Sequence, residues 1–184
     1  MNSNNRNVWG ERILEVIQSE LSVNFLIDGD LKEPQLLNQM VKIQDYLESI
    51  PTVNTTVSIA DIIEEMHKKI MDNDPTYKVI PNTREKINNL FTMYSMSGDP
   101  DDFESLVNYE YDTGLITTMM HTVSTKDVVR IADDIENFLH TETPDLNIEV
   151  SGLMMFLKDF VALVVQSSIT SIFVSIGVIL CIAW

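Results

Sequence analysis

Apolar and polar residues follow two different periods in the first sixty positions. Residues 22–28 alternate with a period of two, which predicts a strand, and the Asp28-Gly29-Asp30 turn closes it. Pro34 is placed to open a helix that runs to Pro51, and residues 52–59 alternate again as a second strand. The apolar positions behind these predictions are Val23, Phe25 and Ile27, then Leu36, Leu37, Met40, Ile43, Leu47 and Ile50, then Val53, Val57 and Ile59, with Thr55 in phase.

A helical segment of about 60–105 interrupts this β-α-β pattern. Ser58 and Asp61 form a predicted cap for a helix over 59–71, and a loop leads to a second helix over 84–96. The residues expected to face inward are Ile62, Ile63, Met66 and Ile70, then Ile87, Leu90, Phe91 and Tyr94. The run Ser97-Gly98-Asp99-Pro100-Asp101-Asp102 breaks the second helix as a turn.

The strand, helix and strand order then repeats. Residues 109–123 alternate and are rich in β-formers, with Tyr109, Tyr111, Thr113, Leu115, Thr117 and Met119 in phase. Ser124 with Asp127 caps a helix that ends before Pro144, and residues 146–150 form the last strand. Two such halves predict an α+β fold, a ferredoxin-like split βαβ sandwich with one antiparallel sheet and helices on one face.

The end of the chain differs in composition from the rest. Residues 160–184 contain no charged side chain, and roughly 20 apolar residues are enough to cross a bilayer as a helix. The pattern starts earlier, at Gly152, so we expect a helix over 152–184 that enters the membrane with no flexible stalk. Its serine and threonine hydroxyls can bond back to the preceding turn or across to a neighbouring helix. The alternative is a buried core helix of a soluble protein.

Charge sharpens this division of the chain. All 28 acidic and 12 basic residues precede residue 160, so the net charge of −16 belongs entirely to that part. Such a surface argues against nucleic-acid binding, which needs Lys and Arg to displace phosphate counterions. The single cysteine, Cys181, lies in the apolar tail, so no disulfide forms within the chain. We divide the sequence into 1–21, a leading helix or linker with an amphipathic pattern over 9–20, then 22–151 and 152–184.

Candidate chemistry is sparse. His67, His121 and His140 lie on different predicted elements, and none has a metal-ligand partner three or four residues away. Asp28-Gly29-Asp30 lacks the further oxygen ligands of a calcium loop, since Lys32 stands where one is needed. No phosphate-binding loop or nucleophile motif is present. We therefore predict no enzyme activity, no catalytic or metal-binding residue and no cofactor.

Three segments carry a resemblance to a known family. Residues 27–63, IDGDLKEPQLLNQMVKIQDYLESIPTVNTTVSIADII, combine a strand, a turn, a Pro-started helix and an S-I-x-D step. Residues 95–120 contain a Gly/Asp turn leading to a strand entry, and IEVSGLMMFLKDF (148–160) passes from strand to helix, with Ser151 where threonine is usual. Over about 22–184, the order of these motifs resembles the resistance–nodulation–division (RND) exporters of the MmpL-type, hydrophobe/amphiphile branch.

The resemblance implies a role and a location. It implies that the chain is a fragment of a proton-driven exporter of lipids or other hydrophobic molecules, comprising the extracytoplasmic porter domain and the second membrane helix. The partners would be the bilayer, an amphiphilic substrate, and the other membrane helices and second porter domain of the same transporter. Residues 1–151 would face the extracytoplasmic side of the cell membrane. Met155, Phe156 and Phe160 near the junction are the residues expected on the substrate path.

Two other hypotheses remain open on the sequence alone. The chain can be a tail-anchored adaptor whose acidic domain binds a protein partner in the cytosol. It can also be a sensor or lipid-binding domain with the same predicted fold. The segments around the chain would separate these hypotheses, because only the exporter requires further membrane spans and a second βαβ repeat.

Overall fold

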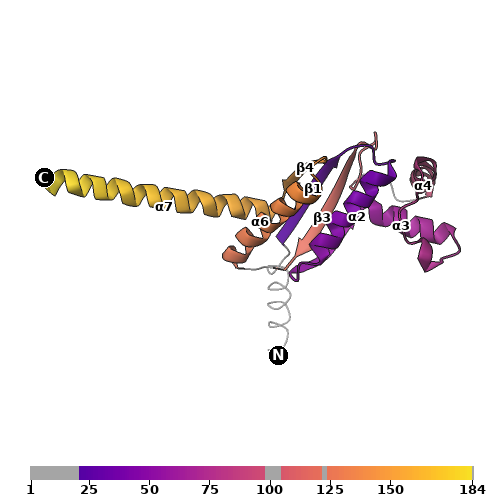
Figure 1. Cartoon of the computed structure of the whole chain (residues 1–184), viewed down its shortest axis with the longest axis horizontal. Helices are drawn as coiled ribbons and strands as arrows, with labels where there is room; N and C mark the ends of the chain where they lie inside the picture. The colour runs from indigo at the N-terminus through magenta and orange to yellow at the C-terminus, as the bar shows by residue number, and fades with distance from the viewer. Residues whose placement is uncertain (1–20, 98–104, 122–123, 184) are drawn as a thin grey trace, which may run out of the picture.

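The computed structural model describes residues 21–97, 105–121 and 124–183. The predicted helix at 9–20 and the turn at Asp99–Asp102 lie outside the described residues. Figure 1 shows a sheet-and-helix domain from which one long helix, α7, projects away on its own. The elements in chain order are β1 (Leu21–Asp28), α2 (Pro34–Glu48), β2 (Val53–Ser58), α3 (Ile59–Ile70), the short 3-10 helix η1 (Pro75–Tyr77), α4 (Arg84–Ser97), β3 (Thr113–Met120), α6 (Thr125–Glu142), β4 (Asn147–Ser151) and α7 (Leu153–Ala183).

The four described strands form one antiparallel sheet in the order β2-β3-β1-β4. Because β3 pairs antiparallel with both β1 and β2, the strands at the two ends of the β1-α2-β2 unit are parallel and separated by β3. Strands β3 and β4, at the two ends of the β3-α6-β4 unit, are likewise parallel to each other and separated by β1. The four-stranded antiparallel sheet and its helices confirm the predicted α+β class.

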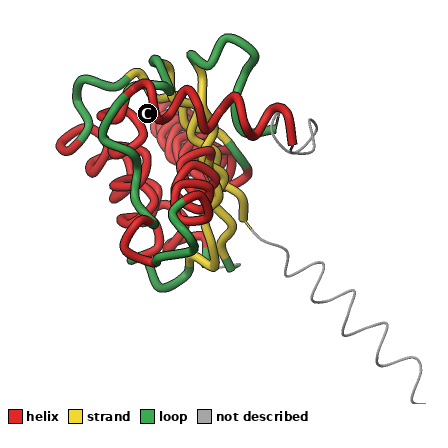
Figure 2. The backbone as a smooth tube through the Cα atoms, turned by 90° about the vertical axis from the view of Figure 1, so that its right-hand side faces the viewer, coloured by secondary structure: helices red, strands yellow, loops and turns green. Residues whose placement is uncertain are grey.

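The helices pack on one face of the sheet, as Figure 2 shows from the side. The residues of β1 that face them, Val23, Phe25 and Ile27, are fully buried, as the alternation predicted. Helix α2 begins at Pro34 and buries the predicted stripe, and α6 buries Val128, Ile131, Ala132 and Ile135. At about 25 cal/mol per Å² of apolar surface, this shared layer is the main stabilising term of the domain.

In two strands, the residues that alternate in phase in the sequence are not the ones that face the helices. In β3 the buried positions are Gly114, Ile116, Thr118 and Met120, so the odd-numbered residues lie on the open face of the sheet. The strand also begins later than residue 109, because a turn with Tyr111 at φ +60° precedes Thr113. In β2 an irregularity between Val53 and Thr55 shifts the phase and turns Thr56 and Ser58 inward.

The polar residues turned inward on β2 are satisfied by a small network. Gln44 on α2 donates to the Thr56 hydroxyl (3.0 Å) and to Asp61 (2.8 Å), and it accepts a hydrogen bond from Ser58 (2.7 Å). Ser58 and Asp61 also form the predicted capping box at the start of α3. Buried polar groups are tolerated when they are hydrogen-bonded, and this network fixes where β2 ends and the inserted helices begin.

The inserted helices and the long helix lie at opposite ends of the domain. Figure 1 shows α3 and α4 on one side of the sheet-and-helix body and α7 leaving from the other. Within the insertion, Ile63, Ile87, Leu90 and Phe91 are buried as predicted, whereas Ile70 is 47% exposed.

Candidate functional site at the root of the long helix

The long helix grows out of the sheet through a single glycine. Strand β4 ends at Ser151, Gly152 has φ +117°, and α7 begins at Leu153. A Cβ atom on Gly152 would lie 2.4 Å from the backbone oxygen of Ser22 on β1. Only glycine combines this backbone angle with so close an approach. The turn from strand to helix is therefore tight, and the described chain contains no linker between them.

The first turn of α7 is anchored in the core of the domain. Met154 is fully buried, and Met155 and Leu157 pack against the core while partly exposed. Leu153 and Phe156 point outward and are 46% and 63% exposed. This division shows that α7 is amphipathic only over its first two turns, where one side belongs to the soluble fold.

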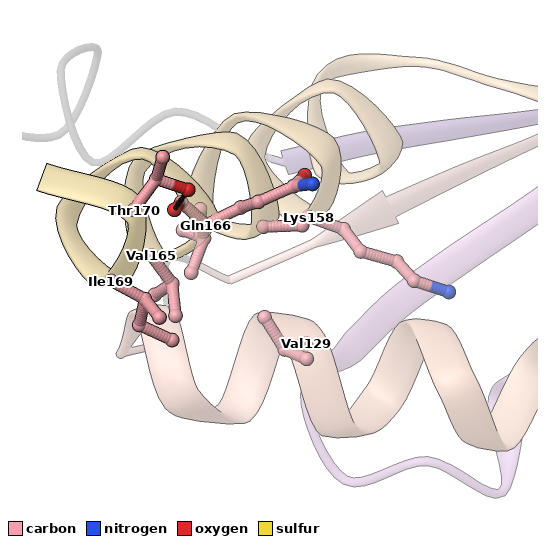
Figure 3. Close-up of a pocket in the computed structure, with 8 residues that line it drawn as sticks. Val129, Lys158, Val165, Gln166, Ile169 and Thr170 are labelled. Atoms are coloured by element: carbon pink, nitrogen blue, oxygen red, sulfur yellow. Dashed lines mark hydrogen bonds between the residues drawn. The ribbon is translucent and has the colours of Figure 1, made fainter. Parts of the chain in front are cut away.

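A lysine clamps α7 to the neighbouring helix α6. The Nζ atom of Lys158 lies 2.9 Å from a carboxylate oxygen of Asp133 and 2.7 Å from one of Glu136. Its side chain is only 19% exposed, whereas the two carboxylates are about half exposed. In Figure 3 the Lys158 side chain extends along α6, and Lys158 lines one end of the groove described next. Three contacts thus fix the direction of α7: Gly152, Met154 and this ion-pair cluster.

Beyond the clamp, α6 and α7 enclose an apolar groove of about 490 Å³. Figure 3 shows Val129 of α6 opposite Val165 and Ile169 of α7, with Gln166 and Thr170 along one edge. Val161 and Ala162 complete the apolar lining. The Thr170 hydroxyl donates to the backbone oxygen of Gln166 at 2.9 Å. The groove therefore offers an apolar surface to whatever lies between the two helices.

The outer part of α7 carries the features of a membrane span. Among the described residues it is the one helix long and apolar enough to cross a membrane. Residues 162–182 are all exposed. The hydroxyls of Ser168, Ser171 and Ser175 each donate to the backbone oxygen four residues earlier, which is one of the two arrangements the sequence predicted.

The predicted substrate-path residues lie near the groove in the chain but not in it. Met155 packs partly against the core, while Phe156 and Phe160 are 63% and 53% exposed and stack with ring centroids 6.3 Å apart. At about 100° per residue, both rings lie on the opposite side of α7 from Val165 and Ile169. The structure therefore brings the two phenylalanines together, and their place on a substrate path stays a prediction.

Sequence reasoning did not single out Val129, Lys158 and the α6 carboxylates as one site. Lys158 is the last basic residue of the chain, and Asp133 and Glu136 stand one turn apart on a predicted helix. Such an ion-pair cluster could have been predicted from two features together. One is a lone basic residue beside an apolar run, and the other is a pair of acidic residues one turn apart on the preceding helix. The sequence does not show which residues of α6 lie opposite which residues of α7, so it could not pair Lys158 with these carboxylates.

The remaining polar clusters are explained by local structure. His67 bonds the Val79 backbone oxygen at 2.8 Å, and His121 lies 3.5 Å from Asn54, so the two rings are held in separate places. Asp30 accepts from the Lys32 backbone and from Arg84, which fits the predicted turn. In the described ranges, no group of three or more His, Cys, Asp or Glu side chains is arranged to hold a metal ion.

Comparisons with protein-family models, with curated proteins and with solved structures found no match to this chain. Any function proposed for the chain therefore rests on the geometry of the site and on the motifs in the sequence.

Breaking the clamp should loosen α7 without unfolding the domain. We expect Lys158→Met to weaken the packing of α7 on α6 by about 1 kcal/mol. The effect is small because the two carboxylate partners of Lys158 are solvated. Distances between spin labels at residues 142 and 174, measured by pulsed electron resonance in detergent, should broaden. Lys42→Met serves as the control, because it removes a different exposed ion pair, in which the Lys42 Nζ atom lies 2.6 Å from a Glu142 carboxylate oxygen. In this control the label is moved from residue 142 to residue 139, so that Glu142 is kept. An unchanged distribution in Lys158→Met would show that Gly152 and Met154 alone set the direction of α7.

Proposed function

We propose that this chain is the extracytoplasmic porter domain and second membrane helix of a proton-driven exporter of lipids or other hydrophobic or amphiphilic molecules, related to the RND superfamily. The single observation that carries the proposal is the rigid junction: β4, Gly152 and α7 follow one another without a linker. A domain joined in this way moves together with its membrane helix. Such coupling suits a transporter, in which movements of membrane helices must be passed to the part that handles substrate.

The fold supports the proposal. The strand order β2-β3-β1-β4, with α2 and α6 as the two crossovers, is the order of a ferredoxin-like split βαβ domain. The inserted α3, η1 and α4 stand between the two halves, and the segment 95–120, which resembles the middle of the family's porter loop, begins at the end of α4. We assign the fold to this class on these grounds.

The surface of α7 supports a hydrophobic substrate. Phe156 and Phe160 are exposed beside the domain, on a helix whose next turns carry no charged side chain. Aromatic side chains at this level can accept the apolar part of a molecule that leaves the bilayer. The carboxylates that carry protons in such an exporter would lie in other membrane helices, because α7 has no acidic residue after Asp159.

A topology measurement tests the location. In a Cys181→Ala background, Glu85→Cys places one thiol on the exposed first turn of α4. A membrane-impermeant maleimide should label it on intact cells, as strongly as after lysis. Labelling only after lysis would place the domain in the cytosol, overturn the porter assignment and favour the tail-anchored adaptor. A thiol at Val174→Cys, in the middle of the exposed part of α7, should resist the reagent in both conditions.

A transport measurement tests the activity. Cells that lack the gene should retain an amphiphilic dye such as Nile red, and the wild-type gene should restore efflux that a protonophore abolishes. Phe156→Ala with Phe160→Ala should slow efflux, whereas Leu163→Ala, which removes another exposed apolar side chain of α7, should not. Efflux that is independent of the gene would remove the proposed activity.

A further inference from the structure

The groove between α6 and α7 lies beside the part of α7 that would enter the bilayer. Residues 162–182 are all exposed and extend for about 30 Å at about 1.5 Å per residue, which is roughly the thickness of the hydrocarbon core. The groove is lined by α7 residues from Val161 to Thr170, together with Val129. It therefore opens next to the first turns of this exposed stretch.

Helix α6 runs back along α7, so that its beginning reaches this level. Asp133 and Glu136 of α6 pair with Lys158, whereas Val129, one turn earlier on α6, faces Val165 and Ile169, which come later on α7 (Figure 3). The two helices are thus antiparallel at the site. The soluble domain does not end where the apolar stretch begins, because the first turns of α6 extend alongside it.

The first turns of α6 have the mixed character that suits a lipid headgroup layer. Val129 faces the groove, while Lys126 and Arg130 on the same turns are exposed. Arg130 lies 3.4 Å from Asp127 and 3.6 Å from Asp134, so its charge is partly balanced within the helix. Asp127 accepts a hydrogen bond from the Ser124 hydroxyl, which keeps the pKa of this carboxyl below its usual value. Apolar and charged side chains at one level match the boundary between headgroups and acyl chains.

The lining of the groove indicates an apolar occupant. Two of the three polar side chains that line it have partners: Lys158 binds two carboxylates, and Thr170 donates to the helix backbone, while Gln166 lies along the edge. Val129, Val161, Ala162, Val165 and Ile169 supply the rest of the surface. An acyl chain gains free energy by burying the apolar part of such a surface.

We infer that α6 makes a second contact with the bilayer: its first two turns lie in the headgroup layer, and the acyl chain of a bilayer lipid fills the groove between α6 and α7. This inference rests on the proposed function only in that α7 must span the membrane. The domain then stands on two points, α7 and the start of α6. Two contacts fix the tilt and rotation of the domain against the membrane, which one helix does not.

Fluorescence quenching by brominated lipids tests the inference. Single cysteines at Val129, Val174 and Glu85, each in the Cys181→Ala background, carry a bimane label on the full chain in phosphatidylcholine vesicles. With lipids brominated near the top of the acyl chain, labels at residues 129 and 174 should both lose fluorescence, and the label at residue 85 should not. Lys126→Cys on the same turn repeats the measurement without altering the groove lining, and should be quenched more weakly than residue 129.

The outcomes separate the inference from the proposal on which it rests. If residue 174 is quenched and residues 129 and 126 behave like residue 85, α7 spans the membrane but α6 does not touch it, and the inference is wrong. If residue 129 is shielded from both brominated lipid and aqueous iodide, protein fills the groove, which also overturns the inference. If residue 174 itself is not quenched, the membrane span fails and the proposed function fails with it.

Discussion

Replacing Gly152 by alanine is expected to destabilise the junction by about 3 kcal/mol or more. A positive φ at a residue with a side chain costs about 1–3 kcal/mol, and the new Cβ would also meet the Ser22 backbone oxygen at 2.4 Å. That oxygen belongs to β1, one of the two inner strands of the sheet, so relief requires β1 and β4 to separate. Hydrogen exchange followed by mass spectrometry in detergent should show faster exchange of the amides in β1 and β4.

The chain contains its own control for this change. Gly177 lies within α7, and a Cβ there would have no neighbour within 4 Å. Alanine is the better helix former, so Gly177→Ala should leave exchange in β1 and β4 unchanged. Equal exchange in wild type and Gly152→Ala would mean that β4 continues into α7 through a looser path than the one described, and the rigid junction would have to be abandoned.

Met154→Ala should have a comparable effect by a different mechanism. The side chain is fully buried where α7 meets the core, so its removal leaves a cavity. Methionine-to-alanine changes at such positions cost about 2–5 kcal/mol. We expect the free energy of unfolding to decrease by an amount in that range. Urea unfolding in detergent, followed by near-ultraviolet circular dichroism, measures it. The long helix should persist, because its own backbone bonds are untouched.

Two further variants make the result for Met154 specific. Leu153→Ala removes a similar side chain that is 46% exposed, and should cost well under half as much. Met154→Leu keeps the volume and should recover most of the stability, since volume-conserving changes cost less than about 1.5 kcal/mol. If Leu153→Ala and Met154→Ala cost the same, the first turn of α7 is not anchored in the core.

Both changes are expected to act on function through the same path. Under the proposed function, a loosened junction would leave the domain folded and the helix in the membrane, but would separate their movements. In the efflux assay, Gly152→Ala and Met154→Ala should therefore lower transport even at temperatures where the domain remains folded. Lys158→Met, with its smaller energetic cost, should have a smaller effect.

The sequence by itself determined the elements and much of the core. Period-two alternation located β1 and β4, Pro34 marked the start of α2, and the Ser58 and Ser124 caps marked α3 and α6. These features are local: a cap or a proline acts within one turn of its own position. The long apolar run was equally legible, because length and absence of charge are enough to identify a candidate span.

Only the tertiary structure decided which side of β2 and β3 faces the helices. Leu115, Thr117 and Met119 alternate as regularly as the buried set, but they lie on the open face and are only half-buried. In β2 a bulge shifts which residues face the helices. As a result, Thr56 and Ser58 point inward, where Gln44 can form hydrogen bonds with them. Alternation gives the period of a strand, whereas the position of the covering helices selects the face.

The site likewise depends on contacts between distant segments. Gly152 meets Ser22 across the sheet, and Lys158 meets Asp133 and Glu136 across a helix pair. Their partners follow from the strand order and from the antiparallel path of α6 and α7, neither of which a local pattern encodes. The sequence thus determined that an acidic α+β domain is followed by an apolar helix, and the packing of β1, α6 and α7 decided that the two are joined without a linker.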